Sequence, residues 1–178
     1  MDIQEKLAMQ RQEEMSYSLA ARTLANSQLV PAAYKGKPGE CEIALGIAQQ
    51  TGLPPLMVMQ NLYIVNGRPT WSGQACAAML DASPKFCKRE IVYVGEENEM
   101  SYGAYVQAYD KELGKTVKGT LVTMQTAKDE GWLDKNGSKW QTMPAQMLAY
   151  RALAFFARVH MPAAMMGLLT PEEAEDIS

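Results

Sequence analysis

The 178-residue sequence has few of the side chains on which enzyme mechanisms depend. It contains one histidine, His160, and three cysteines, Cys41, Cys76 and Cys87, which lack CxxC spacing. A histidine-based triad would therefore have a single candidate base, with no nucleophile evident beside it. The odd number and the spacing of the cysteines favour reduced thiols of a cytoplasmic protein over a disulfide framework.

Motifs for phosphates, metals and membranes are also missing. The sequence has no GxxxxGK[ST] and no GxGxxG, so nothing indicates ATP hydrolysis or a dinucleotide cofactor. No HExxH, DxD or EF-hand loop indicates a metal site. No stretch approaches the roughly 18 to 20 apolar residues of a spanning helix, and the polar N-terminus does not resemble a signal peptide. We expect a protein that is not an enzyme and needs no cofactor.

Basic side chains are concentrated in one part of the chain, although the net charge is only −3. Residues 111–158 hold eight basic and four acidic side chains, and residues 159–178 hold four acidic and no basic ones. The eight basic residues are Lys111, Lys115, Lys118, Lys128, Lys135, Lys139, Arg151 and Arg158. A local basic patch is enough to bind phosphates, but the same lysines also fit an ordinary solvated face.

The first third of the chain predicts two helices joined by a loop. Residues 4–26 have a thin apolar stripe at helical spacing, which suits packing on this chain or on a neighbouring copy. Residues 28–40 are rich in proline and glycine and predict a loop. Residues 41–51 predict a short helix that ends at Gly52.

A β-hairpin is predicted next, because Asn66 and Gly67 separate two β-prone runs. Both central residues of such a turn take positive φ, which these two residue types tolerate. Pro69 cannot donate to a ladder, so the ribbon should lie at an edge. The predicted register groups Leu62, Ile64 and Trp71 on one face, and Tyr63, Val65, Arg68 and Thr70 on the other.

The remaining segments complete an α+β fold. Residues 88–94, 101–109 and 116–123 alternate as strands and are joined by short polar links, which predicts an antiparallel meander. Helices are predicted over residues 76–82, 124–130 and 144–160, with a further helix starting at Pro171. The expected fold is thus a small antiparallel β-sheet, made of a hairpin plus a three-stranded meander, flanked by helices.

We expect three parts along the chain. Residues 1–27 would form an N-terminal helix available for oligomer contact, and residues 28–168 the core. Residues 169–178 would start a C-terminal helix, with Thr170 as N-cap and Glu173 completing a capping box. Because the sequence stops within two turns of that start, we expect it to be a portion of a longer protein.

The helix predicted over residues 144–160 carries two arginines on one face. Arg151 and Arg158 are about 10 Å apart along the axis, and much of this helix is apolar enough to require burial. A buried arginine needs an anion, yet residues 135–171 contain no aspartate or glutamate. The partner is either a carboxylate from elsewhere in the fold or a row of backbone phosphates.

The residues around this helix resemble the signature of RecT-type phage recombinases and, more distantly, the phage Red-beta proteins. The resemblance is carried by K-W-Q-T-x-P-x-x-M-L-x-x-R-A over residues 139–152, by the A-R pair at 157–158 and by the acidic run at 172–176. It extends upstream to G-L-x-P-L at 52–56 and Q-N-L-Y-I-V-N-G-R-P at 60–69. Ala145 and Gln146 depart from the Red-beta pattern, which has two basic residues there.

The resemblance implies a single-strand annealing protein. Such proteins bind single-stranded DNA and pair it with a complementary strand without ATP, in homologous recombination in the bacterial cytoplasm. Their partners are single-stranded DNA and the annealed duplex, further copies of the chain in a ring or helical filament, and a phage exonuclease, which would be contacted through a C-terminal region absent here. No membrane and no cofactor is implied, and the fold implied is a small β-sheet flanked by helices, similar to the core of single-strand annealing proteins.

The DNA contacts expected from the resemblance and its surroundings are Lys128, Lys139, Trp140, Gln141, Arg151 and Arg158. Trp140 would stack on a base or, alternatively, fill the core. Arg68 and Trp71 would form a lip against the bases, or else an exposed cation beside a core tryptophan. Lys88, Arg89 and Lys118, on or beside strands of the meander, would add to the wall of the groove.

Two other functions stay open on the sequence alone. A passive single-strand DNA-binding protein would protect strands without pairing them. A phage structural or assembly protein would use its helices as oligomer contacts, with its arginines meeting carboxylates across subunits.

Overall fold

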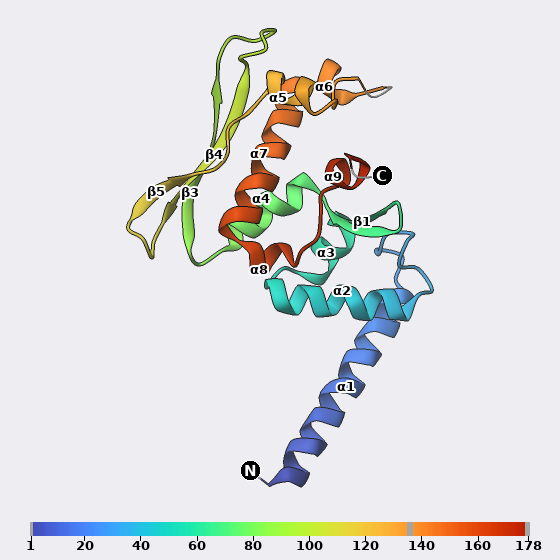
Figure 1. Cartoon of the computed structure of the whole chain (residues 1–178). Coiled ribbons are helices and arrows are strands. Elements are labelled where there is room, and N and C mark those ends of the chain that lie inside the picture. The colour runs from blue at the N-terminus through green and yellow to red at the C-terminus, as the bar shows by residue number, and fades with distance from the viewer. Residues whose placement is uncertain (1, 135–136, 177–178) are drawn as a thin grey trace. The chain divides into compact units, whose positions relative to one another are not determined.

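The structure, a computed structural model, describes residues 2–134 and 137–176 (Figure 1). The chain divides into two compact units, Met1–Leu62 and Tyr63–Ser178. In the described part of the chain, no helix has the length and the apolar character needed to span a lipid bilayer.

The first unit is helical. Its helices are α1 (Ile3–Ala25), α2 (Pro38–Thr51) and α3 (Pro55–Asn61). Asp2 and Glu5 form a capping box that satisfies backbone N–H groups at the start of α1. The helices predicted for residues 4–26 and 41–51 are confirmed, whereas α3 was missed because Pro54 and Pro55 indicated a loop. Proline is accepted in the first turn of a helix, where its missing N–H has no intrahelical partner to lose.

The second unit begins with the predicted hairpin, β1 (Leu62–Val65) paired with β2 (Arg68–Trp71). Asn66 and Gly67 have φ values of 50° and 75°, as a two-residue turn of this kind requires. Burial does not follow simple alternation, because Ile64 is 69% exposed whereas Trp71 is fully buried. The reason is a second neighbour of β2: the carbonyl oxygen of Leu169 accepts from the backbone N–H of Trp71 at 2.7 Å.

The predicted meander is confirmed, with one interruption. Its strands are β3 (Phe86–Val94), β4 (Gly103–Asp110), β5 (Lys115–Lys118) and β6 (Val122–Thr123). The order is β3-β4-β5, all antiparallel, and β6 also pairs with β4, so the expected third strand is broken into two pieces. On β3 the register shifts between Cys87 and Glu90, where one extra residue forms a β-bulge.

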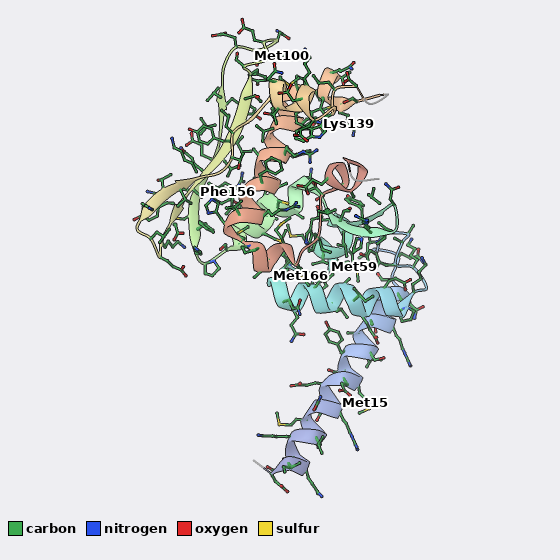
Figure 2. All side chains as sticks on the ribbon, in the orientation of Figure 1. Met15, Met59, Met100, Lys139, Phe156 and Met166 are labelled. Carbon is green, nitrogen blue, oxygen red and sulfur yellow. The ribbon has the colours of Figure 1, made fainter. Side chains whose placement is uncertain are left out.

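Helix α7 (Pro144–His160) covers one face of this sheet (Figure 1). The helix begins and ends where the sequence predicted. The inward residues of β4 and the residues of α7 that are fully buried with them are Ala104, Val106, Ala108, Leu148, Ala152 and Phe156. Phe156 projects from α7 at the level of the sheet (Figure 2). The core of the second unit therefore lies between this helix and the sheet.

Five shorter helices complete the second unit. They are α4 (Gly73–Ala82), α5 (Met124–Asp129), α6 (Lys139–Thr142), α8 (Pro162–Met165) and α9 (Pro171–Asp176). The single turns α6 and α8 were not predicted from the sequence. α4 packs closely on α7, because a Cβ added at Gly73 would lie 2.8 Å from Cγ of Tyr150. The predicted α+β class with antiparallel strands flanked by helices is confirmed, but the hairpin forms a two-stranded sheet of its own, separate from the four-stranded sheet, where one sheet was expected.

Candidate nucleic-acid interface

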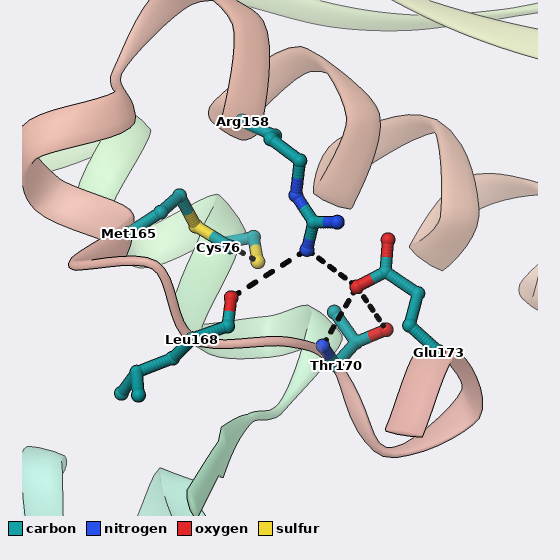
Figure 3. A network of polar contacts seen from close by, with 6 residues as sticks. All are labelled: Cys76, Arg158, Met165, Leu168, Thr170 and Glu173. Atoms are coloured by element: carbon teal, nitrogen blue, oxygen red, sulfur yellow. Dashed lines mark hydrogen bonds and ion pairs between the residues drawn. The ribbon is translucent and has the colours of Figure 1, made fainter. Parts of the chain in front are cut away.

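The guanidinium of Arg158 is held by the C-terminal segment of the same chain (Figure 3). Its Nη2 donates to the carboxylate of Glu173 at 2.6 Å and lies 3.5 Å from the carbonyl oxygen of Leu168. The side chain of Glu173 is 9% exposed and that of Arg158 is 39% exposed. The ion pair is therefore buried on the carboxylate side and partly open to solvent on the arginine side.

The carboxylate of Glu173 serves two helices at once. Besides pairing with Arg158, its Oε2 accepts from the backbone N–H of Thr170 at 2.8 Å and from the Thr170 hydroxyl at 3.1 Å. The bond to the backbone is the predicted capping contact from Glu173 at the start of α9. The pairing corrects the prediction that Arg158 presents a free guanidinium to phosphates, and it selects the alternative of a carboxylate from elsewhere in the fold.

Arg151 is enclosed by aromatic rings. The residue is 4% exposed, and its guanidinium carbon lies 3.9 Å from the centroid of the Trp132 ring and 6.0 Å from that of Phe155. A desolvated cation over an indole ring gains about 2 kcal/mol. Arg151, in the middle of α7, thus supports the core. Its aromatic partners are neither the carboxylate nor the row of phosphates that the sequence left as alternatives.

Trp132 joins Arg151 to the segment that carries the sequence signature. Its ring lies 5.1 Å from that of Trp140, at an angle of 31°. Trp140 is 4% exposed, so it fills the core and offers no ring face to a base. This decides between the two interpretations of Trp140 that the sequence left open.

Two further hydrogen bonds fix the turn before α7. Ser138 donates from its hydroxyl to the carbonyl oxygen of Trp132 at 2.7 Å, and Gln141 donates from Nε2 to that of Leu133 at 2.6 Å. Gln141 is exposed but engaged in this bond. Lys139, Trp140 and Gln141 belong to α6, a single turn whose N-cap is Ser138.

Two lysines flank this turn with free ammonium groups. Lys128 on α5 and Lys139 on α6 are both exposed, and neither forms an ion pair with any residue that the structure describes. Lys139 is labelled beside α6 in Figure 2. Lys135 falls outside the described residues. We call Lys128, Lys139 and Gln141 the α5–α6 surface.

The hairpin provides an exposed cation beside a core tryptophan. Arg68 is exposed, whereas Trp71 has no exposed surface, and its indole Nε1 finds no hydrogen-bond partner among the described residues. Of the two interpretations that the sequence left open for these residues, the structure fits the exposed cation beside a core tryptophan, and it leaves Trp71 no surface to offer to a base.

The three candidates on the meander differ from one another. Arg89 makes a bidentate bond to Asp81 of α4, at 2.7 and 2.9 Å, and this bond raises the pKa of Arg89. Lys88 sits in the bulge with a φ of 54° and is exposed. The ammonium of Lys118 lies 5.3 Å from the centroid of the Tyr105 ring. Lys88 and Lys118 remain available to a ligand, whereas Arg89 is engaged.

Sequence reasoning missed Trp132 and assigned Glu173 only a capping role. Gly131 before Trp132 indicates a helix end, and Glu173 completes a capping box. Both signals concern local structure, and neither indicates that Trp132 contacts Arg151 or that Glu173 pairs with Arg158. In the residues described, no three side chains of the kinds that bind metals come together. Comparison with known proteins identifies no relative: no family model matches, and searches of curated proteins and of solved structures give no significant match.

Proposed function

We propose that this protein binds single-stranded DNA and anneals complementary strands without ATP. The proposal is supported by the resemblance to RecT-type recombinases over residues 139–152. The structural observation that carries it is the α5–α6 surface, where Lys128 and Lys139 are exposed without a carboxylate partner among the described residues. Lys139 belongs to the signature region and Lys128 to the preceding helix α5, and both remain available to phosphates.

The aromatic stack beneath this surface gives it a fixed shape. The side chains of Arg151, Trp132 and Trp140 stack one on the next, and Ser138 and Gln141 tie the turn to Trp132 and Leu133, which follow α5. A surface held in place from below loses little conformational entropy on binding, which favours affinity. In this proposal Arg151 acts by positioning the surface and does not touch DNA.

Annealing places modest chemical demands on such a surface. No bond is made or broken, so strand repulsion has to be neutralised while the bases stay free to pair. The carboxylates of Asp129, Glu130 and Asp134 are exposed in the same segment, so the local field is close to neutral. We therefore expect discrete phosphate contacts, each lysine adding about 0.7 to the slope of log affinity against log salt for a single strand.

A series of copies would extend these contacts along a strand. Helix α1 has exposed apolar side chains that suit contact with another copy: Ile3, Leu7, Met9, Met15 and Leu19. We propose a homo-oligomer, ring or filament, that acts in phage-type recombination in the bacterial cytoplasm beside an exonuclease.

The direct test mixes two complementary oligonucleotides with the protein in the absence of nucleotide. We expect pairing to be faster than in buffer alone. Lys128→Gln and Lys139→Gln should each weaken binding of all sequences alike and lower the salt slope by about 0.7. Lys115→Gln, which removes an equally exposed charge from β5, is the matched control and should leave the slope unchanged at this surface.

Two outcomes would reject the proposal. Slower pairing in the presence of bound protein would identify a passive coat. Absence of binding even at low salt would favour an assembly protein. That alternative expects arginines to meet carboxylates of other subunits, whereas Arg158 pairs with Glu173 of its own chain.

A further inference from the structure

The sheet of the second unit has one face that α7 does not cover. Opposite residues of antiparallel strands share a face, so the register assigns each side chain. On β4, Tyr105, Gln107 and Tyr109 alternate with the fully buried Ala104, Val106 and Ala108. The three outward side chains are half-buried or exposed, and Tyr109 is 37% exposed.

The neighbouring strand adds polar and cationic groups to the same face. Thr116 of β5 lies opposite Tyr109, and Lys118 lies opposite Gln107. The Lys118 ammonium is 5.3 Å from the Tyr105 ring centroid, diagonally across the strand pair. We call Tyr105, Gln107, Tyr109, Thr116 and Lys118 the open face.

The charges on and beside the open face favour an anionic partner. Lys118 forms no ion pair with the described residues. The acid on this side, Glu90, lies opposite Gln107 and accepts from its Nε2 at 2.7 Å. The amide thus occupies an oxygen of the one carboxylate that β3 directs to this face, while Lys118 stays available.

The spacing of the aromatic rings suits an extended strand of nucleotides. Tyr105 and Tyr109 are four residues apart on one strand, which is about 13 Å. Unpaired bases stack on such rings whatever their identity, and a lysine beside the ring meets the adjoining phosphate. A duplex cannot use the rings in this way, because its bases are already stacked and paired.

We propose that the open face is a second contact surface for single-stranded nucleic acid, with bases stacked on Tyr105 and Tyr109 and a phosphate at Lys118. The inference rests on the proposed function and extends it, because a protein that pairs two strands has use for two surfaces. In this proposal the α5–α6 surface contacts only the sugar-phosphate backbone of a strand, whereas the open face contacts bases as well.

The test uses photo-cross-linking with a single-stranded oligonucleotide that carries 5-iodouracil, followed by mapping of the linked peptide. We expect cross-links within residues 103–110. Tyr109→Ala and Tyr109→Leu should both lower affinity for the single strand about tenfold, the loss of roughly one stacked base. The leucine variant keeps an apolar side chain in the strand, and urea midpoints close to that of the unmodified protein would show that the loss of affinity does not come from misfolding.

Two lysines of β5, one on the open face and one not, give a matched pair of variants. Lys118→Gln should weaken binding and lower the salt slope by about 0.7. Lys115→Gln should do neither, because Lys115 lies opposite Asp110 and not on the open face. A fully paired duplex should not compete for the cross-link.

The outcomes separate this inference from the proposed function. Cross-links confined to residues 128–141, with unchanged affinity of the Tyr109 variants, would overturn the open face and leave annealing intact. Failure of the unmodified protein to bind any single strand would overturn both. Equal competition by duplex would overturn base stacking.

Discussion

Replacing Arg158 by alanine is expected to weaken the fold and to leave the salt dependence of DNA binding unchanged. The change leaves the Glu173 carboxylate, 9% exposed, without its charged partner. Breaking a fully buried pair costs about 3 to 5 kcal/mol, and breaking an exposed pair costs about 0.2 to 1 kcal/mol. Because Arg158 is 39% exposed, solvent screens part of the interaction, and we expect about 2 kcal/mol.

A double-mutant cycle isolates the pair. Arg158→Ala, Glu173→Ala and the double variant are unfolded by urea and by heat, with exposed Arg68→Ala as the matched control. We expect a coupling energy of about 1 to 2 kcal/mol and a fall in Tm of about 4 to 8 °C for Arg158→Ala. Arg68→Ala should change stability by less than about 0.5 kcal/mol.

The DNA measurement decides between the two roles of Arg158. If the arginine contacts phosphate, Arg158→Ala lowers the salt slope by about 0.7 for a single strand. If Glu173 is its partner, the slope stays the same in the folded variant. A coupling energy near zero together with a lower slope would refute the ion-pair reasoning.

Three further predictions concern other contacts. The pKa of Asp110 is lowered: burial alone would raise it, but backbone N–H groups of Leu113 and Glu112 and the Lys85 ammonium outweigh burial. The ionised Asp110 therefore stabilises the fold above the usual pKa of 3.8, and this stabilisation is lost as pH falls through the lower pKa of the folded state. In Asp110→Asn the free energy of unfolding should depend less steeply on pH in this acid range, as acid unfolding curves will show. Gly73→Ala should lower the free energy of unfolding by about 1 to 3 kcal/mol in denaturant titrations, because its Cβ meets the Tyr150 ring at 2.8 Å; an unchanged midpoint would contradict this packing. Arg151→Lys should also lose stability although charge is kept, since an ammonium cannot stack on Trp132 as a planar guanidinium does; equal urea midpoints would exclude the stack as a source of stability.

Local signals predicted the elements that depend on local chemistry. The Asn66-Gly67 turn and the helix from Pro144 to His160 both formed as expected. Each is set by backbone conformation or by hydrogen bonds within a few residues. Helix α3 was not predicted, because Pro54 and Pro55 were interpreted as the end of the preceding helix, whereas Pro55 is the first residue of α3.

The partners of the two arginines could not be predicted in the same way. Residues 135–171 contain no acid, and Glu173 lies just beyond them. No local signal in the sequence indicates that α9 folds back onto α7. Arg151 found an aromatic face from Trp132, nineteen positions earlier. Both contacts are tertiary, and spacing along one helix predicts only which side chains share a side, not what they meet.

The extra residue in β3 has a consequence for how the chain tolerates length changes. Phe86 and Ile91 both lie opposite inward residues of β4, Asp110 and Val106, although five positions separate them. In an unbroken pleat an odd separation would send one of them outward. Deleting Lys88 would restore the pleat and place Arg89 opposite the fully buried Ala108, on the inward face. This strand should therefore accept substitutions at position 88 but no shortening.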